Sequence, residues 1–437
     1  MKKQFLFTMA ISGLFLTASA QKVKFTEFDL DNGLHVILHQ DKTAPVVAVS
    51  VMYHVGSKDE DPERTGFAHF FEHLLFEGSD NMKRGEFMKN VSSNGGQNNA
   101  NTSHDRTFYY EIFPSNQLEL GLWLESERML HPKIDEVGVK TQNEVVKEEK
   151  RLRIDNAPYG KFAENIFGHL FEGHPYRWQP IGSMAHLDAA KLSEFLAFFK
   201  KYYAPNNAVL TIAGDLDVDN TKALVKKYFD EVPKGTPIVK QTYELKPITK
   251  QIVDTVYDAN IQIPAIMAAY RVPGMNNEES KVLEMISTVL SGGGSSRLST
   301  KMVDEKKTAL QVAAFNYSLE DYGAYITLAI PNNATPLDDL LKDIDTEVVR
   351  LQTDLISESE YRKLQNQFEN SYVDANSKML GVAENLASGY SFHNKNTDDI
   401  NEELEKVRAI TREQIRDVAR KYLKKDSRVV LYYLPKK

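Results

Sequence analysis

The same succession of sequence features occurs in both halves of this 437-residue chain, and this repetition constrains the fold most strongly. An apolar segment that ends in glycine spans residues 68–78, and a similar segment spans residues 281–294. In the two halves, 36 and 37 residues separate the last glycine from a proline, Pro114 or Pro331, after which a helix is expected. Recurrence of this kind indicates a duplicated domain.

Helical and strand patterns alternate within the first half. Two strand-like segments flank a tight turn at residues 31–33, and another apolar strand pattern covers residues 207–217. Long helical patterns occupy residues 115–130 and 135–156. This order predicts an α+β fold in which helices are interspersed among mostly antiparallel strands. A stretch rich in proline, glycine and polar residues, 231–249, is typical of a linker between domains.

The first twenty residues have the composition of an export signal. Two lysines precede an apolar stretch, and Ala-Ser-Ala forms a small-residue cleavage site before Gln21. A membrane anchor is the alternative, but the apolar stretch is short for a span. We therefore expect a signal peptide over residues 1–20 and a mature protein without a membrane span, exported to a bacterial periplasm. Its two domains are expected at residues 21–232 and 250–437.

Composition limits the chemistry that the chain can carry. It contains no cysteine, which excludes disulfides, thiolate metal ligands and cysteine nucleophiles. Any metal ion would therefore need histidine and carboxylate ligands. The formal net charge of −8 argues against nucleic acid, or an anionic membrane surface, as the main partner.

A helical pattern over residues 67–76 separates two kinds of side chain. At about 100° per residue, one face carries the core-forming residues Phe67, Phe70, Phe71, Leu74 and Leu75. The opposite face carries His69, Glu72, His73 and Phe76. An ordinary solvated face is the alternative, but it rarely uses two histidines or exposes a phenylalanine.

This opposite face has the spacing of a metal site. His69 and His73 lie one turn apart, so that both imidazoles can reach one ion. Glu72 lies beside them, where its carboxylate can face a metal-bound water. The pattern is H-x-x-E-H, the reverse of the H-E-x-x-H zinc-protease helix. The second half of the chain has no such histidine pair.

A catalytic zinc usually has three protein ligands, and the third is expected in the helical segment after residue 140. Glu149 is predicted to lie within the inward face that Val145, Val146 and Leu152 define, where a carboxylate needs a partner such as a metal. Glu144 and Glu148 lie outside or at the edge of that face and are expected to solvate the helix. The sequence thus favours one Zn²⁺ per chain, held by His69, His73 and Glu149.

Five segments resemble the zinc peptidases with the inverted motif, the family of pitrilysin, insulin-degrading enzyme and mitochondrial processing peptidase. They are GFAHFFEHLLFEGS, GGQNNANTSHDRTFYY, NEVVKEEKRLRIDNAPYG, HPYRWQPIG and YYAPNNAVLTIAGDLD. The resemblance covers nearly the whole mature chain and includes a glutamate 76 residues after the second histidine. It implies zinc ligands His69, His73 and Glu149, and a general base, Glu72, in a zinc-dependent endopeptidase that hydrolyses peptides or unfolded polypeptides.

The resemblance also implies an architecture. Two similar domains, each a mostly antiparallel sheet with packed helices, form one half of a clam-shaped chamber. A chain of this length is similar to the processing-peptidase branch, in which two half-length chains pair as a heterodimer or a homodimer. The family usually has an arginine and a tyrosine near the substrate in the second half, but Asp304 and Gln311 stand there in this sequence. A partner subunit would then supply both groups. The alternative is a non-catalytic assembly subunit, which the intact metal motif disfavours.

Three further residues are assigned through this resemblance. Asn99 and Ala100 lie in a segment that is similar to the edge strand with which peptide substrates pair; an asparagine-rich turn is the alternative. Gln142 lies two turns before Glu149, where some relatives have a supporting glutamate, and we expect it to hydrogen bond behind the ligands. The other histidines without a partner at metal spacing are expected to be structural or surface residues: His104, His131, His169, His174 and His186.

Overall fold

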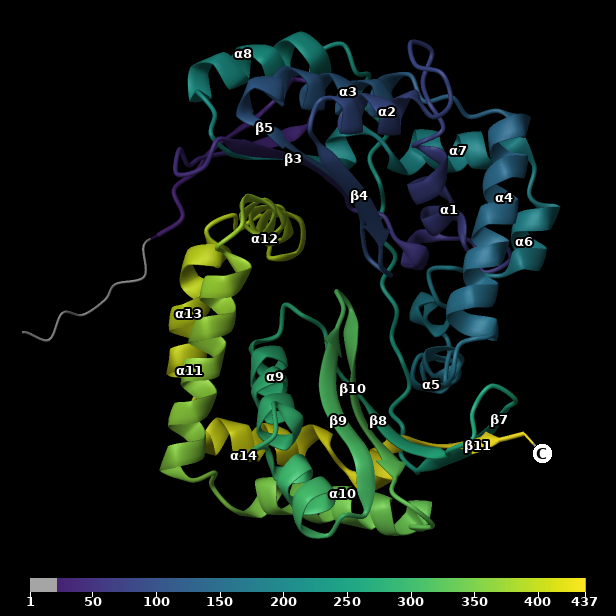
Figure 1. The fold of residues 1–437 in the computed structure, drawn as a ribbon, viewed down its shortest axis with the longest axis vertical. Helices are drawn as coiled ribbons and strands as arrows, with labels where there is room; N and C mark the ends of the chain where they lie inside the picture. The colour runs from purple at the N-terminus through teal and green to yellow at the C-terminus, as the bar shows by residue number, and fades with distance from the viewer. Residues whose placement is uncertain (1–21, 437) are drawn as a thin grey trace, which may run out of the picture.

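A computed structural model describes residues 22–436 and contains two sheets, each with helices packed against it (Figure 1). The predicted α+β fold of two similar domains is confirmed. The predicted signal peptide lies outside the described residues. Among the helices of residues 22–436, none combines the length and the apolar character that a membrane span requires.

The first sheet has six strands in the order β1-β2-β6-β3-β5-β4, of which only β2 and β6 pair in parallel. The strands are β1 (Thr26–Asp29), β2 (His35–Gln40), β3 (Val46–Tyr53), β4 (Gln97–Thr102), β5 (Thr107–Pro114) and β6 (Ala208–Gly214). The helices of this half are α1 (Phe67–Leu74), α2 (Glu86–Ser93), α3 (Leu118–Leu130), α4 (Glu136–Lys150), α5 (Phe162–Leu170), α6 (Met184–Ala189), α7 (Leu192–Tyr202) and α8 (Val218–Phe229).

The second sheet has five strands in the order β7-β11-β8-β10-β9, and β7 and β11 form its parallel pair. The strands are β7 (Ile252–Asp258), β8 (Ala265–Pro273), β9 (Ala309–Ser318), β10 (Tyr322–Pro331) and β11 (Arg428–Pro435). The helices are α9 (Glu278–Ser291), α10 (Leu337–Thr353), α11 (Glu358–Ala375), α12 (Met379–Phe392), α13 (Asp399–Ala409) and α14 (Arg412–Tyr422).

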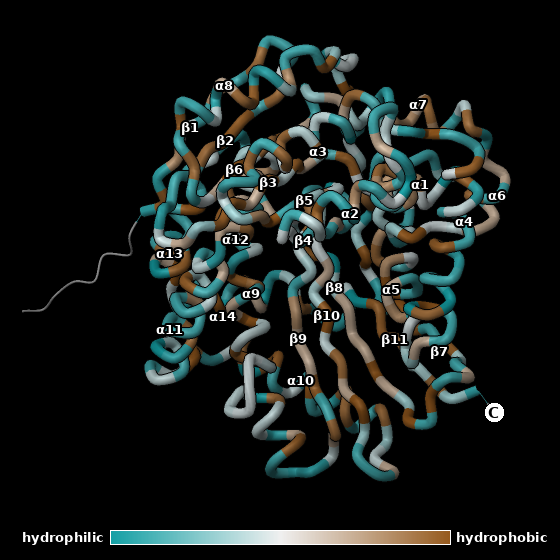
Figure 2. Tube along the Cα trace, turned by 45° about the horizontal axis from the view of Figure 1, so that its top comes forward, coloured by the Kyte–Doolittle hydropathy of each residue, from teal (hydrophilic) through white to brown (hydrophobic). Residues whose placement is uncertain are grey.

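The two sheets repeat one topology. In each half an early strand pairs in parallel with the last strand, and the remaining strands add on antiparallel in the same spatial order. The first sheet differs by the extra strand β1. Strands such as β8 and β11 consist mainly of hydrophobic residues, whereas helices such as α13 are mainly hydrophilic (Figure 2). Residues 233–251 contain no helix or strand; the exact domain boundaries stay a prediction.

Apolar and polar contacts join the two halves. Helix α12 of the second half lies beneath the first sheet (Figure 1), where Val382 and Leu386 pack with Ile37 and Met52. The turn between β9 and β10 approaches the first half with Glu320 and Asp321.

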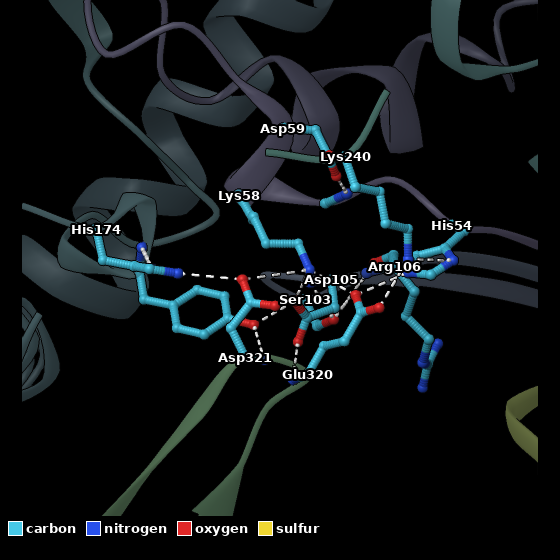
Figure 3. Close-up of polar contacts among 12 residues, drawn as sticks. His54, Lys58, Asp59, Ser103, Asp105, Arg106, His174, Lys240, Glu320 and Asp321 are labelled. Atoms are coloured by element: carbon cyan, nitrogen blue, oxygen red, sulfur yellow. Dashed lines mark hydrogen bonds and ion pairs between the residues drawn. The ribbon is translucent and has the colours of Figure 1, made fainter. Parts of the chain in front are cut away.

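We call the polar group around this turn the junction cluster, and Figure 3 shows it. In it the Lys58 ammonium lies 2.9 Å from an Asp105 oxygen and 2.5 Å from a Glu320 oxygen. The cluster consists of His54, Lys58, Asp105, His174, Lys240, Glu320 and Asp321.

Candidate metal centre

Helix α1 is fixed on its apolar face. The rings of Phe67 and Phe70 pack on Phe195 of α7, with centroids 4.5 and 4.8 Å apart. The Tyr109 hydroxyl donates to the Phe71 carbonyl at 2.9 Å. At the start of the helix, the buried carboxylate of Glu60 accepts hydrogen bonds from the backbone amides of residues 66 and 68, at 2.9 Å each. The predicted two-faced helix is therefore held on one side, which leaves the other side free to present polar groups.

Helix α4 lies beside α1 (Figure 1) and brings Glu149 to the two histidines. The Asp135 carboxylate caps the helix by accepting from the Gly138 amide at 2.7 Å. Val146, one turn before Glu149, is fully buried in the core of the first half. Packing around Val146 thus turns the Glu149 side chain inward.

The predicted inward face of this helix was wrong in two positions. Val145 is 44% exposed and Leu152 is 63% exposed. Adjacent residues differ by about 100° on a helix, so that Val145 points away when Val146 is central. Leu152 lies beyond the regular helix in a π-helical segment, Arg151–Asp155, where the period of 3.6 residues no longer applies.

Three potential ligand atoms converge between α1 and α4. The Glu149 Oε2 atom lies 3.4 Å from His69 Nε2 and 3.2 Å from His73 Nε2. All three atoms lie within 4.8 Å of one another, and the three side chains are between 11% and 23% exposed. The two imidazoles hold the pKa of the Glu149 carboxyl well below its usual range, although burial opposes them. The carboxylate is therefore ionised at neutral pH, as a metal ligand must be.

The donor set fits a zinc ion. Tetrahedral zinc with ligand bonds of about 2.0–2.2 Å separates its ligand atoms by roughly 3.3–3.6 Å, close to the two nitrogen–oxygen distances found here. Glu149 Oε2 and His69 Nδ1 are buried without a hydrogen-bond partner in the described part of the chain. A buried oxygen of this kind calls for a cation or an ordered water. The other Glu149 oxygen is 2.8 Å from the Arg153 guanidinium.

Glu72 lies on the same helix and is anchored by a residue that we did not single out from the sequence. The Thr102 hydroxyl, at the end of β4, donates to Glu72 Oε2 at 2.7 Å. Strand alternation places Ala100 and Thr102 on one half-buried face and Asn99 on the exposed face. Ala100 was predicted to contact substrate, and Thr102 lies two residues later on the same face of the strand. This spacing could have identified Thr102 from the sequence.

Strand β4 forms an outer edge of the first sheet, and within residues 22–436 it pairs only with β5 (Figure 1). The segment of Asn99 and Ala100 is thus an edge strand rather than a turn. A sheet edge of this kind can add a strand from an extended peptide, and here it lies beside α1.

The other residues that were considered from the sequence contact groups other than the three converging atoms. The Gln142 amide donates to Glu77, the residue four positions after His73. Glu144 and Glu148 pair with Lys147 and Arg151 at the surface. Asp304 and Gln311 are both exposed in the second half, Gln311 on the edge strand β9.

The five histidines that were expected to be structural or surface residues lie outside this group. His169 and His174 contact Asp254 and Asp321 at 2.7 and 3.1 Å. His186 is 2.9 Å from the Thr65 hydroxyl, and His131 is 3.8 Å from Asp80. His104 is buried.

Comparison with known proteins relates most of the chain to zinc proteases. Residues 35–170 match the family model described as "Insulinase (Peptidase family M16)", and residues 190–368 match "Peptidase M16 inactive domain". The zinc protease PqqE of Helicobacter pylori is 31% identical over 359 residues, which cover 80% of each chain. The uncharacterized zinc protease YmxG of Bacillus subtilis is 25% identical and covers 92% of this chain and 97% of its own.

Solved structures show the same architecture. The crystal structure of a protease from Helicobacter pylori has a TM-score of 0.89 and 27% identity, and the match covers 94% of this chain and all of that one. The periplasmic protease PqqL of Escherichia coli has a TM-score of 0.79 at 19% identity. That match covers 95% of this chain but 48% of PqqL, and it shows the shared fold.

Proposed function

The chain belongs to the M16, or insulinase, family of peptidases, and on that premise we propose that it is a zinc-dependent endopeptidase acting on peptides or unfolded polypeptides. The observation that carries the proposal is the convergence of His69, His73 and Glu149 within 4.8 Å, with Glu72 on the same helix as the histidines. These three residues would hold one Zn²⁺. Bound zinc lowers the pKa of its water to about 7 and polarises a carbonyl.

The chain's own residues supply the proton transfers and the alignment. Glu72 accepts a proton from the attacking water at a carboxylate oxygen and delivers it to the nitrogen of the leaving amine. The free edge of β4 pairs with the extended peptide through main-chain hydrogen bonds, beside Asn99 and Ala100. Such pairing requires an extended backbone, which favours unfolded substrates over folded ones. Gln142 hydrogen bonds to Glu77, three residues beyond the end of α1, and would steady the segment that follows the ligand helix.

A two-subunit enzyme is part of the proposal. The metal-ligand group lies in the first half, and Asp304 and Gln311 replace the expected arginine and tyrosine in the second. A second half-length subunit, as heterodimer or homodimer, would complete the substrate site.

We also propose export to the periplasm on the basis of residues 1–20. Purification from the native cell tests both points, through the mass of the complex and an N-terminus at Gln21.

The variant Glu72→Gln tests the assignment of a peptidase. We expect the wild-type protein, with its partner where one co-purifies, to bind about one zinc and to cleave a quenched peptide. Glu72→Gln should keep the zinc and lose roughly 10²–10⁴-fold in kcat, because the amide cannot accept the proton. Metal analysis and peptide cleavage measure both quantities. The control Glu144→Gln alters an exposed carboxylate of α4 and should change neither.

Two outcomes would contradict the proposal. Cleavage by Glu72→Gln at the wild-type rate would remove Glu72 as the base. A wild-type complex that binds no zinc and cleaves no peptide would favour the alternative, an assembly subunit with this fold.

A further inference from the structure

The anchoring of Glu72 by Thr102 has a consequence for catalysis, provided that the proposed function holds. The backbone of α1 is fixed by its packing, but a glutamate carboxylate turns about three further side-chain torsions. Within residues 22–436, the Thr102 hydroxyl is the one group that hydrogen bonds with the Glu72 carboxylate. It occupies Oε2, and no hydrogen bond within residues 22–436 occupies Oε1.

The Thr102 hydroxyl is not needed to shape its own strand. Backbone pairing joins Thr102 to Thr107, and the Ser103 amide donates to the Arg106 carbonyl at 2.8 Å across the turn. The Arg106 guanidinium also holds Asn101, at 2.8 Å. Because these contacts fix the end of β4 without the hydroxyl, the hydroxyl's contact with Glu72 serves Glu72 rather than the turn.

We propose that Thr102 is a positioning residue that holds the Glu72 carboxylate in the orientation required for proton transfer. Thr102 belongs to the same strand, and to the same face of that strand, as Ala100. The strand proposed to hold the peptide therefore also sets the position of the base. One rigid element would thus align both reactants, and an error of about 1 Å in such alignment can cost on the order of 100-fold in rate.

The variants Thr102→Val and Thr102→Ser separate this role from simple packing. Valine keeps the shape of threonine and removes the hydroxyl, whereas serine keeps the hydroxyl. We expect Thr102→Val to lower kcat about 10- to 100-fold, with KM within about twofold and zinc content unchanged. Thr102→Ser should recover kcat to within about threefold of the wild type. Thr346→Val, which removes an exposed hydroxyl bonded to its own helix, is the matched control.

Crystal structures of the metal-free variants give a second readout that does not depend on activity. Glu72 should stay within hydrogen-bonding distance of residue 102 in the wild type and in Thr102→Ser, and should adopt other rotamers in Thr102→Val. Wild-type kcat in Thr102→Val would overturn the proposal, as would an unmoved Glu72 or an equal loss in both variants. An inactive wild-type complex would instead count against the proposed function, and the positions of Glu72 would still decide the role of Thr102.

Discussion

The metal-ligand group and the junction cluster use the same residue types, but their polar atoms are satisfied in opposite ways. At the junction, the Glu320 carboxylate faces nitrogens of His54, Lys58 and Lys240 at 2.8, 2.5 and 2.7 Å. Between α1 and α4, Glu149 Oε2 has two imidazole nitrogens at 3.2 and 3.4 Å and forms no hydrogen bond in the described chain. The Glu320 carboxylate is thus satisfied by protein cations, as in a structural cluster, whereas the buried Glu149 oxygen still requires a partner such as a cation or an ordered water.

The pKa values of Glu149 and Glu320 are both lowered, but the charged partners of the two carboxylates differ. Burial alone raises the pKa of Glu320, but its contacts with His54, Lys58 and Lys240 hold that pKa well below the ordinary value. Burial alone lowers the pKa of Lys58, and the surrounding carboxylates raise it above the ordinary value. The junction cluster thus contains its own counter-ions. In the metal-ligand group the Arg153 contact uses the outer oxygen of Glu149 and leaves the inner one for a cation.

Removing one ligand should have the largest effect. Glu149→Gln keeps the shape of the side chain but removes its charge, and we expect zinc affinity to fall at least about 100-fold, more than for loss of a supporting group. At a zinc concentration 100 times the wild-type Kd, the ion should stabilise the wild type by about 2.7 kcal/mol and the variant by about 0.4 kcal/mol or less. Urea unfolding with and without zinc measures the difference. Equal stabilisation of both proteins would show that Glu149 is not a ligand.

Breaking the junction cluster should change stability and leave zinc binding intact. Glu320→Gln leaves the ammonium of Lys58, whose side chain is only 10% exposed, with fewer carboxylates around it, so that the free energy of unfolding should fall by about 2 kcal/mol. The control Glu119→Gln breaks an exposed pair with Lys227 and should change it little. If Glu320→Gln lost zinc affinity as Glu149→Gln does, the two clusters would not be independent.

The sequence predicted most of what depends on local periodicity and spacing. The two faces of α1 follow from its apolar pattern. Helical periodicity favoured Glu149 and the family resemblance implied the same residue, which the structure brings to the histidines. Thr102 and Glu60 escaped notice, because their roles depend on which elements meet in space. The predicted apolar face failed at Val145, which points away from the buried Val146, and at Leu152, where the helix changes its period.

The junction cluster could not have been predicted from local sequence. Glu320 and Lys58 are 262 residues apart, and either would pass for a solvated surface residue. Only the packing of the β9–β10 turn against the first half shows that they are buried together.

A buried histidine near the junction offers the smallest effect and a test by pH. His104 is 1% exposed and lies among the rings of Phe167, Tyr176 and Tyr317. Burial lowers its pKa to about 4. The unfolded chain therefore takes up a proton at His104 near pH 6.5, which the folded protein resists. This histidine stabilises the fold fully above that pH, and the contribution is lost as the pH falls toward 4.

Asp59, on the neighbouring 3₁₀ turn, has the opposite effect, because burial raises its pKa to about 6. Its folded form keeps a proton that the unfolded chain has lost, so that its contribution to stability grows as the pH falls through 6. The two groups partly cancel in the wild type. A flat pH profile of the wild-type protein would thus conceal two titrations of opposite sign.

Single variants should separate the two titrations. Between pH 6.5 and 5.5, the wild type should lose about 1 kcal/mol of stability relative to His104→Leu and gain about 0.7 kcal/mol relative to Asp59→Asn. Urea unfolding of the three proteins at both pH values measures these differences, in metal-free buffer so that the metal-ligand group does not contribute. Identical pH slopes in all three would mean that water reaches His104 and Asp59. The region around the junction cluster would then admit water to its buried groups, and the contrast between a satisfied structural cluster and a site that requires a further partner would fail.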